Sequence, residues 1–302
     1  MAIPIRTFGD LIGIYQAHCK DIHKNTINVG FPTLHKSMRG LRKGELMTVL
    51  AKTGVGKSIL TLNFTLNFIL QHSEEIAIIV SLEMNESSLA ERMMQILLKL
   101  SGDEVEKAFL EDNSMIIDVA KSYIANLEDL LVINQRLDVN DIPNIIRQTE
   151  KQRNKKVSLL IIDHVSILKN RDFTRDPYGR ITDNMVKLYD MAKYLNLAVI
   201  NVSQISREEG KKDSLTVYAG KESGEVENSS DFLVAIELVN SNTTRENEVG
   251  MIEAIRRYKP GRYCLMKLTF LKTRRNKIEP LYVLFDTKTI LMHEYNNKTL
   301  TS

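Results

Sequence analysis

The stretch Ala51-Lys-Thr-Gly-Val-Gly-Lys57-Ser58 decides the fold expected for this chain. It follows the apolar run Leu46–Leu50 and precedes a segment near Ser58–Gln71 with helical apolar spacing. The pattern is that of a phosphate-binding P-loop with Ala in the first position instead of Gly. A strand before the loop and a helix after it are the context that such a loop requires, and a chance Gly-rich turn would lack it.

Each residue type in this loop has a chemical reason. Gly54 and Gly56 let the backbone curl so that its N–H groups face phosphates, and the helix N-terminus adds the positive end of its dipole. Lys57 is expected to reach the β- and γ-phosphates, and the Ser58 hydroxyl is expected to ligate Mg²⁺. The loop therefore predicts a nucleoside triphosphate site whose binding residues are Thr53, Gly54, Val55, Gly56, Lys57 and Ser58.

Two carboxylates follow apolar strands elsewhere in the chain. Asp163 ends the run Leu159–Asp163, where a P-loop enzyme holds the carboxylate beside Mg²⁺. A strand-end Asp is by itself more often a turn or cap residue, so the P-loop is what gives it meaning. Glu83, in Ser81-Leu-Glu-Met84, could act as a general base for the attacking water or as an acid near the next helix. Position alone leaves these two readings even.

Two other features stay open on the residues alone. Gln204 ends a strand-like run and could sense the γ-phosphate, although the residues alone favour a satisfied polar strand end. The cluster Lys272-Thr-Arg-Arg-Asn-Lys277 could be a solvated turn. It could also supply an arginine finger to a neighbouring subunit's triphosphate.

The apolar runs predict an α/β fold with a mainly parallel central sheet and flanking helices. Expected strands are Leu46–Leu50, Ile76–Leu82, Leu130–Asn134, Val157–Asp163 and Ala198–Ser203, and expected helices lie near 58–71, 86–100, 139–153 and 183–195. Phe232–Val239, Leu265–Leu271 and Leu281–Phe285 follow with no long helices between them, which suggests added antiparallel strands at the C-terminal side. Three polar segments are expected to be loops: Lys169–Gly179, Ser206–Gly224 and Asn240–Asn247.

The chain divides into a lead-in, residues 1–29, and a larger domain, residues 30–302. In the lead-in, Phe8, Leu11, Ile12 and Tyr15 recur at helical spacing. Such a helix could pack on its own core or dock as an arm on a neighbouring subunit. The sequence does not decide between these readings.

The overall composition limits which classes of protein the sequence fits. The net charge of +3, from 41 basic and 38 acidic residues, is too mild to indicate nucleic acid by itself, since clustering decides binding. With 6% aromatic residues and no Trp, base-stacking platforms are few. Two cysteines, no signal peptide and no apolar run of ~18 residues favour a cytoplasmic protein without a membrane contact.

Together these residues resemble the RecA-like C-terminal motor domain of DnaB-family replicative DNA helicases. The matching stretches are Gly30–His35, Ala51–Ser58, Ser81–Met84, Leu160–His164, Val202–Arg207, Lys221–Asp231 and the Arg-Arg-Asn cluster at 274–276. Many ATPases share the P-loop, whereas Glu83 in its motif and the Glu-Ser-Gly segment at 222–224 are far more specific.

The resemblance implies roles position by position. Lys57 and Ser58 would bind phosphate and Mg²⁺, Glu83 would be the catalytic base, and Asp163 would be the metal carboxylate. Gln204 would link the γ-phosphate to DNA-binding loops. Arg275, which directly precedes Asn276, would be the arginine finger. Thr273 stands where the family has a Lys, so either Lys272 or Arg274 would partner the finger.

The resemblance also implies ATP and Mg²⁺ as cofactors, a homo-hexameric ring, single-stranded DNA as substrate, and a helicase loader and primase as partners. The loops at 169–179 and 208–224 match DNA-holding loops of the central channel. Their candidate phosphate contacts, taken as a group, are Arg171, Arg175, Lys211, Lys212 and Lys221. Only about 29 residues precede the motor, where family members usually carry an N-terminal helical domain. Either the chain is a motor-only helicase, which would suit a phage, prophage or plasmid, or another polypeptide supplies that domain's function.

Two other readings remain. The chain could be a RecA- or KaiC-like DNA-binding or signalling ATPase that does not unwind DNA. It could also be a non-catalytic accessory subunit, although the intact Lys57, Ser58, Glu83 and Asp163 argue against that.

Overall fold

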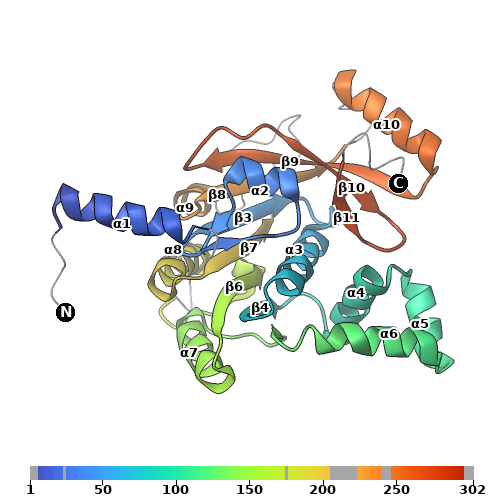
Figure 1. Ribbon diagram of the computed structural model, residues 1–302, viewed down its shortest axis with the longest axis horizontal. Coiled ribbons are helices and arrows are strands. Elements are labelled where there is room, and N and C mark those ends of the chain that lie inside the picture. Colours follow the sequence, from blue (N-terminus) through green and yellow to red (C-terminus); the bar gives the residue numbers. More distant parts are fainter. Residues whose placement is uncertain (1–5, 23–24, 174–175, 205–222, 240–245, 296–302) are drawn as a thin grey trace.

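The computed structural model describes residues 6–22, 25–173, 176–204, 223–239 and 246–295 (Figure 1). Its centre is a nine-stranded sheet in the order β11-β10-β9-β8-β3-β7-β6-β4-β5. The strands of this sheet are β3 (Leu46–Ala51), β4 (Glu75–Ser81), β5 (Leu130–Ile133), β6 (Lys156–Asp163), β7 (Ala198–Gln204), β8 (Phe232–Leu238), β9 (Tyr263–Thr273), β10 (Leu281–Asp286) and β11 (Met292–Glu294). A small second sheet pairs β1 (Thr26–Ile27) with β2 (Leu41–Arg42).

The described residues also form helices, several of which pack on the two faces of this sheet. They are α1 (Phe8–Lys20), α2 (Pro32–Met38), α3 (Lys57–Gln71), α4 (Glu86–Leu98), α5 (Gly102–Leu110), α6 (Ser114–Ala125), α7 (Ile142–Arg153), α8 (Pro177–Leu195), α9 (Ser223–Asn228) and α10 (Glu246–Tyr258), with 3₁₀ turns at Val139–Asp141 and Val165–Ile167.

Strands β3 to β8 are parallel, which confirms the parallel sheet expected from the continuous apolar runs. One expectation is wrong here: β8 pairs with β3 in parallel, with Phe232 opposite Met47, instead of antiparallel. The chain between Gln204 and Phe232 exceeds the dozen or so residues that a parallel crossover needs, so no long helix was required. Strands β9, β10 and β11 are antiparallel, as expected.

Several helices differ from the sequence expectation. The thirteen-residue α10 lies between β8 and β9, where no long helix was expected, and it buries Ile255 against Leu265 and Leu284. Helices α5 and α6 were not expected either; Ser101 forms a capping box at the start of α5. Helix α8 begins at Pro177 instead of near Asp183, so Gly179 lies in a helix and not in a loop.

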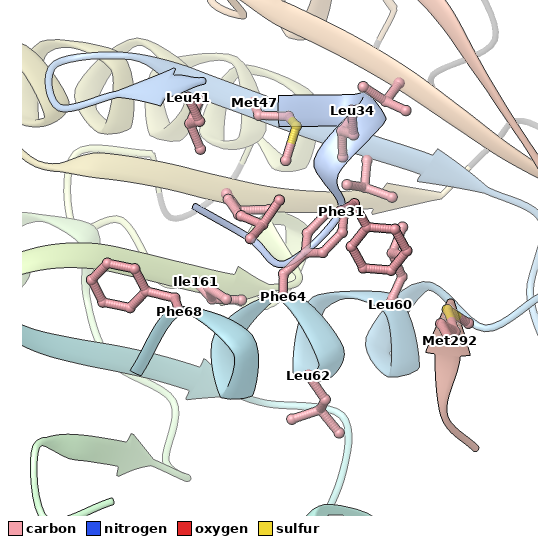
Figure 2. Packing of buried hydrophobic residues seen from close by; sticks show 14 of the residues in the cluster. Phe31, Leu34, Leu41, Met47, Leu60, Leu62, Phe64, Phe68, Ile161 and Met292 are labelled. Atoms are coloured by element: carbon pink, nitrogen blue, oxygen red, sulfur yellow. The ribbon is translucent and has the colours of Figure 1, made fainter. Parts of the chain in front are cut away.

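Alternate residues of the central strands face two cores. On one face Val49, Ile79 and Ile161 pack against α3, whose Phe64 ring meets Phe31 edge to face with centroids 5.2 Å apart (Figure 2). On the other face the apolar residues of the same strands pack against α7 and α8. Each such large side chain contributes about 1.5–3 kcal/mol when fully buried, so the two cores fix the strands and the loops that end them.

Helix α1 differs from the others because none of its residues is buried. It extends from one end of the molecule (Figure 1). The helix expected in the lead-in is confirmed, but it does not pack on its own core. Within the described part of the chain, no helix combines the length and apolar character needed to cross a bilayer.

Candidate nucleotide-binding site

The loop Ala51–Ser58 joins β3 to α3 at the edge where the parallel strands end, which we call the carboxyl edge. Gly54 and Gly56 have φ values of +81° and +101°. A Cβ on Gly54 would meet nothing within 4 Å, so the backbone conformation, and not space, requires glycine there. No side chain caps the first turn of α3 and no acidic residue lies in it. Its N–H groups therefore remain available to an anion.

The expected metal residues meet beside this loop. Ser81 and Asp163 are register partners at the ends of β4 and β6, and the Ser58 hydroxyl donates a hydrogen bond to Asp163. Burial raises the pKa of Asp163, and the negative charge of Glu83 raises it further, whereas the Ser58 hydrogen bond and the nearby Lys57 lower it. The four side chains therefore share one electrostatic environment.

The donor set fits Mg²⁺. Asp163 is only 3% exposed, and its Oδ1 atom has no hydrogen-bond partner. Mg²⁺ bound with a triphosphate takes one or two protein oxygens, phosphate oxygens and waters, so a spare carboxylate lone pair beside the Ser58 hydroxyl suits it. The described residues contain no cluster of three or more His, Cys, Asp or Glu side chains that would hold a metal without the nucleotide.

Glu83 lies just beyond β4, exposed at the carboxyl edge. The N-cap of α4 is Asn85, whose side chain accepts a hydrogen bond from the Ser88 N–H at 2.8 Å. Glu83 is therefore not needed as a cap, which removes the main structural explanation for it. Gln204 is the register partner of Ala51, so it stands beside the start of the loop.

Arg275 lies at the opposite edge. Thr273, at the end of β9, pairs with Phe232, the first residue of β8, so the cluster follows the amino ends of the parallel strands. A strand of this length spans about 20 Å, which separates Arg275 from the phosphate loop of its own chain. Its guanidinium forms an ion pair with Glu45 and donates to the carbonyl of Gly40 at 2.9 Å.

The neighbouring basic residues have different partners. Arg275 is 15% exposed, whereas Arg274 is 44% exposed, donates to the Asn228 carbonyl at 3.1 Å and pairs with Asp231. Lys272 donates to the carbonyl of Glu227. All three are held within the chain, and none approaches the chain's own phosphate loop.

Among the candidate DNA contacts, only Arg171 belongs to the described residues; Arg175, Lys211, Lys212 and Lys221 lie outside them. Arg171 forms ion pairs with Asp138 and Asp141, and the Asp141 hydrogen bond raises the pKa of Arg171. Its guanidinium is therefore already engaged.

The sequence did not predict one wall of the site, which the C-terminal strands form. A Cβ on Gly56 would lie 3.5 Å from the Met292 methyl and 3.6 Å from that of Met266, which places the C-terminal strands beside the loop. Asn63 of α3 accepts a hydrogen bond from the Met292 N–H at 3.0 Å and donates to the Ile290 carbonyl. More than 200 residues separate these partners, and no local pattern signals such a contact.

The sheet order, the loop and the two carboxylates define a RecA-like P-loop nucleotide-binding domain. The chain belongs to the family of the DnaB-like helicase C terminal domain, whose model matches residues 26–290. Over 235 residues it is 23% identical to a probable plasmid replicative DNA helicase of Chlamydia trachomatis, covering 76% of this chain and 51% of that protein. The chain thus spans about half the length of the curated relatives it matches.

Solved structures share the fold. The ATPase domain of G40P superposes with a TM-score of 0.79 at 16% identity, over 97% of this chain and 100% of that one. A DnaB-like replicative helicase, described with its interactions with primase, gives 0.76 at 17% identity, over 97% and 68%. A KaiC-like protein of Pyrococcus horikoshii gives 0.55 at 16% identity, over 90% and 99%.

Proposed function

We propose that this chain is the motor of an ATP-dependent DNA helicase, a hexameric ring that moves along single-stranded DNA and hydrolyses ATP between subunits. The observation that carries the proposal is the separation of the two halves of the site. The loop, Glu83 and Asp163 lie at the carboxyl edge, and Arg275 lies at the amino edge. One chain cannot bring them together, whereas a head-to-tail neighbour can.

Each residue at the carboxyl edge would have a separate role in ATP hydrolysis. The loop N–H groups and Lys57 would hold the phosphates, and Ser58 and Asp163 would hold a metal ion, which would supply charge neutralisation for the phosphates. Glu83 accepts a proton from the attacking water. Gln204, next to Ala51, is suited to register the γ-phosphate. Arg275 of a neighbouring chain would stabilise the charge that develops on the transferred phosphoryl group, once it leaves Glu45.

Two apolar surfaces supply a head-to-tail contact. Helix α1 exposes Phe8, Leu11, Ile12, Ile14 and Tyr15. At the opposite end of the molecule, α5 and α6 expose Phe109, Leu110, Met115 and Val119 (Figure 1). Exposed apolar patches of this kind mark interaction sites. We propose that α1 is an arm that covers the α5–α6 surface of the next subunit. Two different surfaces that meet in this way generate a ring when the rotation closes. The last lead-in residues belong to the chain's own core instead, since β1 pairs with β2 and Ile27 and Val29 are buried.

The remaining partners follow from the family. We propose single-stranded DNA as the substrate, bound through the segments 169–179 and 208–224, whose last residues belong to α8 and α9 and not to loops. We propose a helicase loader and a primase as partners. Arg171 would then exchange Asp138 and Asp141 for DNA phosphates. We propose that such a motor acts in the bacterial cytoplasm, or in the host cytoplasm if it is phage-encoded.

The alternative, a RecA- or KaiC-like ATPase without unwinding, shares the fold at a lower TM-score. The family match favours the helicase. A forked DNA substrate separates the two: the assembled protein should release the labelled strand with ATP and Mg²⁺, and the Lys57→Ala variant should not. Rings that hydrolyse ATP on this substrate without releasing the strand would overturn the helicase and favour the alternative.

A further inference from the structure

The segment Ser81–Met84 carries Glu83 from the end of β4 to the start of α4. Beyond Ser81 the segment belongs to neither a helix nor a strand. A general base in such a bend needs external contacts to hold its carboxylate in one place, because loop residues otherwise sample several positions.

Asn134 provides those contacts. It follows β5, whose last residue, Ile133, is the register partner of Val80. Its side-chain amide donates one hydrogen bond to the Ser81 carbonyl at 2.8 Å and a second to the Met84 carbonyl. One amide proton donates to a carbonyl before Glu83 and the other to a carbonyl after it. The Asn134 side chain therefore connects the two ends of the bend.

The other side of the bend is held by β6. The N–H of Leu82 donates to the carbonyl of Asp163 at 3.0 Å. The position of Glu83 relative to the metal carboxylate is therefore set by two neighbouring strands, with Asn134 on one side and the Asp163 backbone on the other.

We propose that Asn134 is a positioning residue that holds the Glu83 carboxylate for the attack of water on the triphosphate. This rests on the proposed function, in which Glu83 is the general base. Asn134 acts through the backbone of the Glu83 segment, since its two donors are occupied by carbonyls of that segment. The phosphate loop follows a different strand, β3, so nucleotide binding is expected to be independent of Asn134.

The chemistry specifies an amide. An Asp at this position keeps the shape but has only acceptors at neutral pH, which would face two carbonyl oxygens. An Ala keeps neither shape nor donors. A displacement of about 1 Å in a catalytic group can reduce turnover ~10²-fold.

The test measures DNA-stimulated ATP turnover of the assembled protein for Asn134→Ala and Asn134→Asp. We expect kcat to fall about tenfold to a hundredfold in both, with the KM for ATP within about twofold of its original value. The matched control is Asn126→Ala, which removes an amide that donates to the Ser122 carbonyl at 3.0 Å on the exposed end of α6. Its kcat should not change. An Asp variant with full kcat would show that shape alone matters and would overturn the proposal.

A double variant separates positioning from general loosening of the fold. In a Glu83→Gln background, Asn134→Ala should cause no further loss of the residual turnover, because its effect passes through the Glu83 carboxylate. A further tenfold loss there, or a loss of affinity for a fluorescent ATP analogue, would assign Asn134 a structural role instead. If Glu83→Gln alone leaves turnover unchanged, the proposed function fails first. If it abolishes turnover and Asn134→Ala has no effect, only this inference fails.

Discussion

The two edges of the parallel sheet differ in how their charged side chains are paired. At the amino edge, Lys43 pairs with Glu75 and Lys155 with Asp129, each at 2.5 Å, and Arg275 pairs with Glu45. At the carboxyl edge, Asp163 Oδ1 and the Ser81 hydroxyl are buried without hydrogen-bond partners, and the first turn of α3 has no cap.

We interpret the carboxyl edge as a binding edge and the amino edge as one that mainly stabilises the fold. A buried polar group without a partner costs about 1–3 kcal/mol, and a ligand that supplies the partner removes that cost. The carboxyl edge is therefore built for a bound group. At the amino edge most charged groups are paired within the chain, although Arg42 Nε and Glu75 Oε2 are also buried without hydrogen-bond partners; its partly exposed ion pairs add only modest stability. The amino edge also contains Arg275, the residue that the proposed function assigns to the site of another chain.

The largest expected effect is at the carboxyl edge. Glu83→Gln removes the proton acceptor for the attacking water and should reduce ATP turnover ~10²–10⁴-fold while ATP still binds. Turnover and nucleotide affinity are measured together. The matched control is Glu86→Gln, the next acid along the chain, in the first turn of α4, which should retain turnover. Equal losses in both variants would contradict the role of Glu83.

The second effect links the two edges. Arg275→Ala should reduce turnover ~10³-fold if the finger acts between chains, as transition-state arginines do. Mixing it with Lys57→Ala chains, which lack the other half of the site, should restore part of the activity, because some interfaces then combine an intact Lys57 with an intact Arg275. The Arg274→Ala variant changes the more exposed neighbouring arginine, and its turnover shows how much Arg274 contributes to ATP hydrolysis. No recovery on mixing would place both residues in one chain's site.

A smaller effect is expected from the arm. Leu11→Glu places a charge on the exposed apolar face of α1 and should shift assembly to higher protein concentration, by about tenfold. Mass measurements with a nucleotide analogue follow the shift, and Phe109→Glu on α5 should reproduce it. Gln16→Glu, on the same helix, is the control for charge alone. Unchanged assembly in both apolar variants would remove the proposed contact.

The smallest effect is on stability. Burial raises the pKa of Asp163 in the folded chain, so its charged form destabilises the fold above that pKa. Acidification through the raised pKa should therefore stabilise the nucleotide-free protein as far as this group is concerned. Asp163→Asn should raise Tm by about 2 °C at pH 7 and abolish Mg²⁺-dependent turnover. Asp118→Asn, at an exposed site on α6, is the control. A lower Tm for Asp163→Asn would show that the charge stabilises the fold.

The local features were predictable from sequence, and the distant ones were not. The phosphate loop, Glu83, Asp163 and Gln204 lie where apolar strands end, and parallel strands bring their ends to one edge. The Arg275–Glu45 pair joins residues 230 positions apart, and Asn134 donates to the carbonyl of Ser81, 53 positions away in sequence. Neither carries a motif. Helices α5, α6 and α10 were missed, although Ser101 and Glu104 form a capping box at the start of α5 and Asn113 caps α6.

The direction of β8 also could not be predicted from the sequence. An apolar run such as Phe232–Val239 fits a parallel or an antiparallel neighbour equally well, because both bury its alternate residues. The pairing of Phe232 with Met47 is decided by how the chain crosses the sheet.

The central claim is that each site is shared by two chains. It is tested most directly by measuring ATP turnover per chain against protein concentration, with mass determined in the same samples. The account predicts that single chains bind ATP but hydrolyse it slowly, and that turnover per chain rises together with assembly. A monomeric chain with full turnover would contradict it.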